Sequence, residues 1–385
     1  MSRRILSVTV ARSDYGIYQP VWDAILAHPD LELDLVVAAA HLDDRYGHTI
    51  DQIQRDGYPI AAEVPMLEPG DTPLDMARAS GRGTMGFAEA YANTPHDALL
   101  LLGDRFEMHA AAVAAVPFLT PIAHLHGGEE TTGAVDNSYR HSITKLSHLH
   151  FVSNQQHADR VIQMGENPAH VFVSGAPAID RMLGSHHPGR TEIEQHLGHA
   201  LPDRFLIATF HPVTTEYQQA GEQADAFLSA LFEFGMPTLL TLPNADMGGL
   251  AVREAVSRHA INKLLMVHEN LGARLYPAVM ALAEAMVGNS SSGIIEAASL
   301  HLPVVNIGTR QEGRMRSGNV IDVATTQEAI VAGLRQATSP DFRRYVQGVQ
   351  NVYGSGDAGK LIAQTLAEVD LGPRLIRKAF CDQPS

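Results

Sequence analysis

Short apolar segments alternate along most of the chain with longer stretches of helical periodicity. Each apolar segment is continuous and ends in small or polar residues, as is typical of strands buried on both faces of a parallel sheet. In the first part of the chain these segments are ILSVTV, LELDLVVAAA, HDALLLLGD, TPIAHLH and HLHFVS. The alternation predicts successive βαβ units, and therefore an α/β fold built on parallel sheets.

The alternation is interrupted once and then starts again. The interruption is a polar stretch, SHHPGRTEIEQHLGHALPD, and the segments that follow it are RFLIATFHP, PTLLTLPN, NKLLMVHEN, AMVGNSSSG and LPVVNIG. A chain of 385 residues also exceeds the size at which a single hydrophobic core usually stops growing. We therefore expect two doubly wound domains, residues 1–183 and 184–365, and a C-terminal helix over 366–385 that packs back across their boundary.

The composition and the lack of certain segments indicate which binding partners and which cellular compartment to expect. A net charge of -15, with only 28 Lys and Arg spread over the chain, argues against nucleic-acid binding, which needs a clustered basic face. The single cysteine, Cys381, allows neither an internal disulfide nor a CxxC metal site. The N-terminal MSRRILSVTVARSD lacks the features of a signal peptide, and no apolar stretch is long enough to cross a membrane. We expect a soluble cytoplasmic protein without nucleic-acid or membrane partners.

Polar loops directly follow several of the apolar segments. These loops are ARSDYG, GDRFE, HLHGGEETTGAVDNSYRH, HPVTT and GNSSSG. In open α/β sheets, ligands bind beyond the carboxyl ends of the strands. We therefore expect all of these loops on one rim, around a single cleft between the two domains.

The segment GNSSSGIIEA combines a strand end, three serines between glycines and a helix that begins near Gly293. Such a helix start presents unpaired backbone N–H groups, and the hydroxyls of Ser290, Ser291 and Ser292 add donors, which suits a phosphate or diphosphate. The serines could instead only cap the helix. Glu296, one turn further on, could accept both hydroxyls of a ribose or could be a solvated acid that complements the helix dipole.

Charged and amide side chains stand at other predicted strand ends. Arg12 and Asp14 follow the first strand, and His211 and Asn244 follow two strands of the second half. The planar fork of an arginine suits phosphate oxygens, and a histidine there can donate a hydrogen bond to the same group. Each residue by itself could have only a surface role, but a shared rim favours ligand binding.

The segment GDRFEM places Asp104 at a strand end and Glu107 in the first turn of the next helix. An aspartate in this position is often only the helix N-cap. Arg105 could be the ion-pair partner of Asp104.

The stretch 124–141 is dense in titratable groups. They include His124, His126, Glu129, Asp136, Arg140 and His141. The histidines could suggest zinc, but neither an HExxH spacing nor a cysteine supports a metal site. We interpret the stretch as a glycine-hinged loop that presents His126, Glu129 and Asp136 as acid and base groups. The alternative is a solvated loop whose histidines are satisfied structurally.

Several long motifs occur in an order that resembles a known enzyme family. They are GDRFEM, HLHGGEETTGAVDNSYRHSITKLSHLHFVS, VFVSGAPAID, HPVT and GNSSSGIIEAASLHLPVVNIGTRQEGR. From ARSDYG to about Asp322, the chain is similar to the hydrolysing UDP-N-acetylglucosamine 2-epimerases of sialic-acid and legionaminic-acid synthesis. The resemblance implies a glycosyltransferase-B-like fold of two Rossmann-like domains, with the catalytic acids in the first and the nucleotide in the second, and a homodimer or homotetramer.

The resemblance also implies a two-step reaction. The C2 proton of the sugar is removed as the nucleoside diphosphate leaves C1, which gives a 2-acetamidoglycal. Water then adds to give UDP and the free 2-epimer, such as N-acetylmannosamine. Because the C2 proton is not acidic, a positioned base and stabilisation of the departing diphosphate must act together. The elimination needs no redox cofactor.

Individual residues match functional positions of the family. Asp104 and Asp136 match acids implicated in the chemistry, and Glu129 lies in the matching HGGE segment. On the nucleotide side, the matching residues are His211 and Arg12 at the diphosphate, Ser290 and Ser291 at the phosphates, Glu296 at the ribose, and Arg310 and Arg314 in GTRQEGR. One position departs from the sialic-acid enzymes, which read HIEGGE where this chain has His126.

This departure leaves the proton acceptor and the substrate open. His126 or one of the acids could take the C2 proton. The substrate could be UDP-N-acetylglucosamine, or a UDP- or GDP-linked 2,4-diacetamido-2,4,6-trideoxy sugar as in legionaminic acid synthesis. A non-hydrolysing epimerase, a glycosyltransferase and a sugar-nucleotide sensor are further hypotheses. The density of acids argues against a sensor, because a binder of anions gains nothing from carboxylates.

Overall fold

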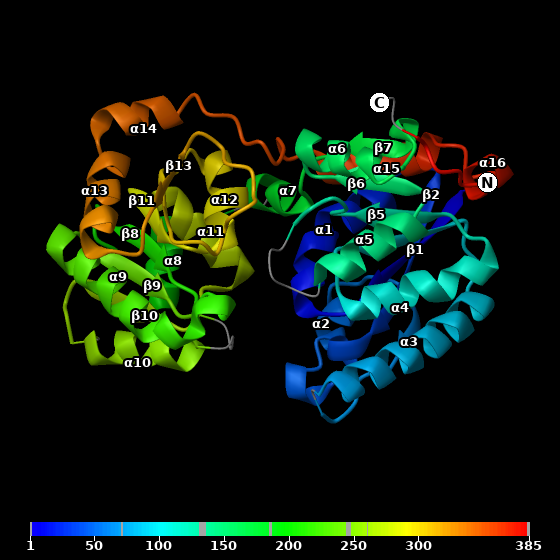
Figure 1. Cartoon of the computed structure of the whole chain (residues 1–385), viewed down its shortest axis with the longest axis horizontal. Coiled ribbons are helices and arrows are strands. Elements are labelled where there is room, and N and C mark those ends of the chain that lie inside the picture. The colour runs from blue at the N-terminus through cyan, green and yellow to red at the C-terminus, as the bar shows by residue number, and fades with distance from the viewer. Residues whose placement is uncertain are drawn as a thin grey trace. The chain divides into compact units, whose positions relative to one another are not determined.

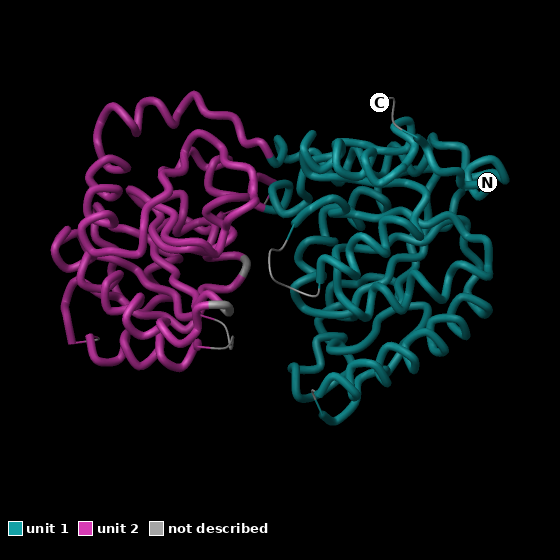
Figure 2. Tube along the Cα trace, viewed as in Figure 1, with its two compact units in different colours: residues 1–181, 353–385 teal, residues 182–352 magenta. Residues whose placement is uncertain are grey.

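The structure is a computed structural model that describes residues 2–70, 72–130, 136–184, 187–243, 248–259 and 261–382. The chain divides into two compact units (Figure 2). Unit 1 comprises Met1–Arg181 and Tyr353–Ser385, and unit 2 comprises Met182–Val352. One candidate ligand named from the sequence, Asn244, lies outside the described residues.

Unit 1 contains a parallel sheet, which has seven strands among the residues that the structure describes, in the order β3-β2-β1-β4-β5-β6-β7. The strands are β1 (Arg3–Thr9), β2 (Leu31–Ala38), β3 (Ile60–Val64), β4 (Ala98–Leu102), β5 (Ile122–Leu125), β6 (Leu149–Val152) and β7 (Val171–Val173). The helices are α1 (Arg12–Ala27), α2 (Ile50–Arg55), α3 (Pro73–Asn93), α4 (Phe106–Ala115), α5 (Asp136–Leu146), α6 (Gln155–Gln163), α15 (Ala358–Glu368) and α16 (Pro373–Ile376), with α7 (Pro177–Gly184) at the boundary. Helices α3, α4 and α5 lie side by side (Figure 1).

Unit 2 repeats this plan with a parallel sheet in the order β10-β9-β8-β11-β12-β13. Its strands are β8 (Leu206–Thr209), β9 (Thr238–Thr241), β10 (Leu265–His268), β11 (Ala285–Gly288), β12 (Val304–Ile307) and β13 (Val320–Val323). Its helices are α8 (Arg190–Leu197), α9 (Ala220–Phe234), α10 (Gly249–His259), α11 (Gly272–Leu282), α12 (Ser291–Ile295), α13 (Gln327–Ala337) and α14 (Pro340–Val346). No helix among the described residues is long and apolar enough to span a membrane.

Both strand orders reverse direction once, as in Rossmann folds. The reversal lies between β1 and β4 in unit 1, and between β8 and β11 in unit 2. A crevice opens beyond the carboxyl ends of the strands at such a point, and ligands of doubly wound sheets bind there. The predicted fold class, α/β with two Rossmann-like units, is confirmed.

All ten apolar segments named from the sequence form strands, and three further strands, β3, β7 and β13, lie at sheet edges. The central strands are buried on both faces, as β4 and β5 show along their whole lengths. These three strands are only partly buried: β3 and β13 each include an acidic residue, and β7 is only three residues long.

The C-terminal segment packs within unit 1. Helix α15 lies along α1, and Gly359 approaches the backbone of Pro20 so closely that a Cβ would clash with its carbonyl. The carboxylate of Asp180 accepts hydrogen bonds from the N–H groups of Ala358 at 3.0 Å and Gly359 at 2.6 Å. Residues 353–385 therefore belong to unit 1, whereas the sequence pattern had placed residues up to 365 in the second domain.

Candidate active site

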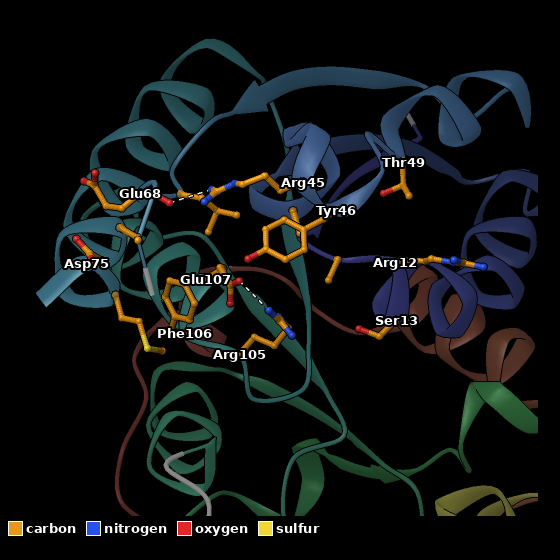
Figure 3. Close-up of a pocket in the computed structure, with 16 residues that line it drawn as sticks. Arg12, Ser13, Arg45, Tyr46, Thr49, Glu68, Asp75, Arg105, Phe106 and Glu107 are labelled. Atoms are coloured by element: carbon orange, nitrogen blue, oxygen red, sulfur yellow. Dashed lines mark hydrogen bonds and ion pairs between the residues drawn. The ribbon is translucent and has the colours of Figure 1, made fainter. Parts of the chain in front are cut away.

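A cavity of about 460 Å³ lies at the carboxyl edge of the unit 1 sheet (Figure 3). The loops after β1 and β4, which flank the reversal point, both line it. Its polar lining includes Arg12, Ser13, Arg45, Tyr46, Thr49, Glu68, Asp75, Arg105 and Glu107. Ala40, Leu67, Met76, Ala79 and Phe106 supply an apolar wall. The cavity can therefore accept a group that has both polar and apolar surface.

An ion pair between the partly exposed Arg105 and the buried Glu107 borders this cavity. Arg105 donates through Nη2 to Oε1 of Glu107 at 2.9 Å, and the Glu107 side chain is 1% exposed. The other carboxylate oxygen of Glu107 and Nε of Arg105 are buried and have no hydrogen-bond partner among the described residues. Because unpartnered buried polar atoms are costly, these two atoms are candidates for contact with a ligand.

Arg105 does not pair with Asp104, as the sequence had suggested. Arg105 is itself the N-cap residue of α4, in an extended conformation, and no side chain caps that helix. Asp104 lies in the turn before Arg105, and no ion pair joins their two side chains among the described residues. Asp104 is therefore not an N-cap, and its carboxylate is available to another partner.

Asp14 is directed into the protein. Its carboxylate accepts hydrogen bonds from the backbone N–H groups of Val10 at 3.3 Å and Ala11 at 3.2 Å, at the start of α1. Burial raises the pKa of Asp14 to about 6, although the positive charge of Arg105 acts against this rise. Arg12 lines the cavity and Asp14 does not.

Arg140 joins the loops that follow β4 and β5. This residue of α5 is 5% exposed, and its guanidinium forms an ion pair with Asp104. Nη1 of Arg140 also lies 3.4 Å from Oε2 of Glu129 and donates to the backbone oxygen of His126 at 3.3 Å. Three predicted catalytic residues thus meet at one buried cation. This role of Arg140 could not be predicted from the sequence, because Asp104, His126 and Glu129 lie 36, 14 and 11 residues before it.

Glu129 is held as a carboxylate. It lies 2.6 Å from Nδ1 of His126 and accepts a hydrogen bond from the hydroxyl of Ser153 at 3.0 Å. Burial by itself would raise the pKa of Glu129, but the interaction with the imidazole of His126, including a hydrogen bond, and the positive charge of Arg140 outweigh burial and lower the pKa below its ordinary value. Glu129 is therefore a poor proton donor and a well-held acceptor of hydrogen bonds.

Asp136 has the opposite character. It is the first residue of α5, and it is partly buried. Burial and the negative charge of Asp104 raise the pKa of Asp136, and the positive charges of two arginines only partly oppose them. A carboxyl with a raised pKa holds its proton more readily than an ordinary aspartate does, which suits a general acid.

The histidines of this stretch have separate surroundings. His124 is fully buried, donates from Nε2 to the backbone oxygen of Gly103 at 2.8 Å, and has a pKa that burial lowers to about 3. His141 lies 3.3 Å from Glu130. Within the described residues, no group of three His, Cys, Asp or Glu side chains is arranged to hold a metal ion. His124 is thus a satisfied structural histidine.

Unit 2 has a cavity of about 580 Å³ at the carboxyl edge of its sheet. Its lining residues come from the loops after β8, β9, β10 and β11, and they include Thr209, His211, Pro243, Glu269, Asn270, Tyr276, Ser290, Ser292 and Glu296. The lining is largely hydroxyls and other polar groups. These are the groups that bind the phosphates and ribose of a nucleotide.

Asn289 fixes His211 at the edge of this cavity. Its side chain accepts from the N–H of His211 at 2.7 Å and donates to the backbone oxygen of His211 at 2.8 Å. Burial, reinforced by the positive charge of Arg310, lowers the pKa of His211 to about 4. His211 is therefore a neutral imidazole, and its Nδ1 is buried without a hydrogen-bond partner among the described residues.

The serines after β11 form a hydroxyl cluster. Ser290 is the N-cap of α12, and its Oγ lies 2.9 Å from Oγ of Ser292, which in turn lies 2.9 Å from the hydroxyl of Tyr276. Gly288, at φ +136°, lets β11 approach the backbone of Thr209 so closely that a Cβ would clash. Ser290 thus caps the helix, as one of the two interpretations of the sequence has it. The hydroxyls of Ser290, Ser292 and Tyr276 also line the unit 2 cavity.

The other residues that the sequence predicted to bind the nucleotide differ in their position relative to the unit 2 cavity. Arg310 and Gln311 donate to the backbone oxygen of Asn289, at 3.0 Å and 2.9 Å, so the loop that follows β12 contacts the loop that follows β11. Ser291 and Arg314 are not among the residues that line the cavity. Asn244 stays a prediction, because it lies outside the described residues.

Comparison with known proteins identifies the family. The family model for UDP-N-acetylglucosamine 2-epimerase matches residues 23–367. The chain belongs to the UDP-N-acetylglucosamine 2-epimerase family. The resemblance seen in the sequence motifs is thereby confirmed, and the family places the chain among enzymes that act on UDP-linked sugars.

Individual members of this family match the chain over nearly its whole length. A UDP-N,N'-diacetylbacillosamine 2-epimerase (hydrolyzing) of Legionella pneumophila is 36% identical over 98% of this chain and 99% of its own. A UDP-N-acetylglucosamine 2-epimerase of Neisseria meningitidis serogroup B is 32% identical over 88% of each chain. The crystal structure of UDP-GlcNAc 2-epimerase from Neisseria meningitidis bound to UDP-GlcNAc shares the fold, with a TM-score of 0.77 and 17% identity over 95% of this chain and all of that one.

Proposed function

We propose that the protein is a hydrolysing 2-epimerase, which converts a UDP-linked 2-acetamido sugar into UDP and the free 2-epimer. The observation that carries the proposal is the cluster around Arg140, which gathers Asp104, Glu129 and His126 at the carboxyl edge of the unit 1 sheet. In the proposed reaction, elimination of UDP gives a 2-acetamidoglycal, and water then adds to C1.

The first step needs a base at C2 and a good leaving group at C1. Unit 2 offers donors for the diphosphate, because the hydroxyl cluster of Ser290 and Ser292 and the buried imidazole of His211 all line one cavity. Donors that are already in place stabilise charge as it develops on the departing oxygen. Arg12 and Arg310 are further proposed contacts of the diphosphate, and Glu296 is the proposed contact of the ribose.

The second step needs an acid. Epimerisation inverts C2, so the new proton must arrive at the face opposite to the one that lost a proton. Asp136, whose pKa is raised by burial and by Asp104, is the proposed donor of that proton. Asp104, held by Arg140, is the proposed carboxylate whose negative charge keeps the pKa of Asp136 raised.

UDP-N-acetylglucosamine is the first candidate substrate, with N-acetylmannosamine as its product. A UDP-linked 2,4-diacetamido-2,4,6-trideoxy sugar is the second, and two observations favour it. The Legionella relative is named for such a sugar. The unit 1 cavity also has an apolar wall, formed by residues such as Phe106 and Met76, which suits a methyl group in place of a hydroxymethyl.

The test is to incubate the purified protein with each of the two UDP-sugars, and with a GDP-linked counterpart, and to follow free nucleotide by phosphorus NMR and free sugar by proton NMR. We expect stoichiometric UDP and the 2-epimer from at least one of them. A UDP-linked epimer without free UDP would indicate a non-hydrolysing epimerase, and product that forms only with an added acceptor would indicate a glycosyltransferase. Binding without turnover of any sugar would indicate a sensor.

A further inference from the structure

A chain of hydrogen bonds extends from His126 into the protein. Nδ1 of His126 lies 2.6 Å from Oε1 of Glu129, and the hydroxyl of Ser153 lies 3.0 Å from the same oxygen. On its other side, the Ser153 oxygen lies 2.9 Å from Nδ1 of His157. Ser153 and His157 are 2% and 4% exposed, and neither stood out in the sequence. Ser153 is the last residue of the family motif HLHGGEETTGAVDNSYRHSITKLSHLHFVS, and His157 lies beyond that motif.

The donors and acceptors in this chain have one consistent assignment. Glu129 is a carboxylate and only accepts, so Nδ1 of His126 must donate to it and the Ser153 hydroxyl must donate to it as well. Ser153 has then used its only proton, so His157 must donate from Nδ1 to the Ser153 oxygen. In the neutral imidazole of His126, the other nitrogen, Nε2, therefore carries a lone pair.

Nε2 of His126 is an unsatisfied end of this chain. It is buried, and it has no hydrogen-bond partner among the described residues. A buried acceptor without a partner is costly unless a ligand or substrate supplies one.

The backbone holds His126 in an uncommon conformation. Its φ is +63°, in the left-handed region that residues other than glycine rarely adopt. Its N–H donates to Phe151 of β6 at 3.0 Å, and its carbonyl accepts from Arg140 of α5 at 3.3 Å. Gly128, two residues on, approaches the backbone of His157 so closely that a Cβ would clash. Contacts on both sides thus fix the position of the imidazole, as is common at functional sites.

We propose that Nε2 of His126 is the base that removes the C2 proton, and that Glu129, Ser153 and His157 form a chain that positions it. This inference rests on the proposed function. The C2–H bond breaks and its proton moves to Nε2, while its electron pair forms the C1=C2 bond. The C1–O bond breaks, and that electron pair leaves on the β-phosphate oxygen of UDP. His126 later returns the proton to solvent, and the positive charge that it carries in between is opposed by Glu129.

The acids nearby are less suited to this step. Glu129 accepts from His126 and Ser153 and lies beside Arg140, so its oxygens are occupied. Asp104 is tied to the same guanidinium. The charged and titratable groups that surround His126 are Glu129 on its own loop, Arg140 on α5, His157 on α6 and His124 on β5. Of these, only Glu129 is an anion, so its removal should favour the neutral imidazole.

The test compares His126→Gln, Glu129→Gln and the pair Ser153→Ala and Ser153→Thr with the wild type. We expect His126→Gln to lower kcat by more than about 100-fold, with KM changed less than about threefold. Glu129→Gln should lower kcat by about 10-fold or more and move the acid limb of the kcat profile to lower pH. Ser153→Ala should lower kcat by about threefold to tenfold, and Ser153→Thr, which keeps the hydroxyl, should restore it.

A control variant and an NMR measurement distinguish a positioning role of Ser153 and Glu129 from a general effect on the fold. Ser174→Ala is the matched control, because Ser174 is also buried next to β6 but donates only to backbone oxygens; it should leave kcat and the pH profile unchanged. Nitrogen-15 NMR of histidine-labelled protein, assigned with His126→Gln, should show the proton of neutral His126 on Nδ1. This tautomer is measurable without any turnover.

The outcomes distinguish the two proposals. Three results would each overturn the base assignment while the proposed function stands. The first is a kcat of His126→Gln within about threefold of the wild type. The others are a pH profile whose acid limb Glu129→Gln does not move, and a neutral His126 protonated on Nε2. Absence of UDP release from every sugar nucleotide by the wild type would overturn both.

Discussion

Glu166 gives the most quantitative prediction for stability. Its side chain is 2% exposed and lies 2.6 Å from Nζ of Lys145, 2.9 Å from Nε2 of His150 and 2.7 Å from Nζ of Lys378. Lys378 also donates to backbone oxygens at the end of α5, including that of Lys145 at 2.7 Å. The carboxylate thus joins the C-terminal segment to the helix that carries Arg140.

The pKa of Glu166 sets the size of the effect. Burial alone would raise it, but the three hydrogen bonds from basic side chains outweigh burial and lower the pKa from 4.5 to about 2. Because the folded pKa is the lower one, the stabilisation is fully present above pH 4.5 and is lost as the pH falls towards 2. A shift of this size corresponds to about 3 kcal/mol at pH 7 and about 2 kcal/mol at pH 3.5.

The perturbation is Glu166→Gln, measured by urea unfolding at both pH values. The only tryptophan, Trp22, is fully buried in unit 1, so its fluorescence reports the unit that contains Glu166. We expect the variant to lose about 3 kcal/mol at pH 7 and less at pH 3.5. Glu32→Gln, at an ion pair with Arg4 in which both side chains are about half exposed, is the control and should change little. A loss below about 1 kcal/mol at pH 7, or a loss that does not shrink at pH 3.5, would refute the reasoning.

The remaining predictions concern the candidate residues of unit 1, the cavity of unit 2 and one backbone position. Asp104→Asn and Asp136→Asn should each lower kcat by more than about 100-fold while the Kd for UDP, measured by calorimetry, changes less than about threefold. Ser292→Ala should weaken UDP binding by about 10-fold with kcat nearly unchanged, because it removes a donor from the unit 2 cavity; an unchanged Kd would remove the hydroxyl cluster from the binding site. Gly288→Ala should destabilise unit 2 by more than about 2 kcal/mol in hydrogen exchange, because its Cβ would clash with β8. Gly235→Ala, also at positive φ but in open space, should cost only about 1 kcal/mol.

Much of the fold could be predicted because burial on both faces leaves a plain pattern in the sequence. The central strands, such as β4 and β5, are continuous apolar runs, and each is followed by a polar loop. The strands β3, β7 and β13 were not predicted, because β3 and β13 each include an acidic residue and β7 is only three residues long.

The candidate site was predictable only as a set of loops. The parallel strands of each sheet have their carboxyl ends at the same edge. The loops that carry Asp104 and Glu129 in unit 1, and His211 in unit 2, could therefore be named without coordinates. The partners within the site could not, because tertiary packing decides them. Ser153 and His157 meet Glu129 only because Gly128 lets the loop approach α6, and nothing in their spacing indicates that contact.

The packing of the C-terminal segment could not be predicted from the sequence either. Its helical pattern was evident, but the pattern does not say which unit a helix packs against. The absence of a Cβ at Gly359 permits close contact with α1, and Asp180 holds the start of α15. Both features depend on residues far away in the sequence.

The most direct test of the proposed reaction is proton NMR of the purified protein with a UDP-linked 2-acetamido sugar in deuterated water. The account predicts free UDP together with a free 2-epimer that carries deuterium at C2, because the glycal must take its new proton from solvent. A free epimer that keeps its original hydrogen at C2, or a released sugar that is not epimerised, would contradict elimination followed by hydration.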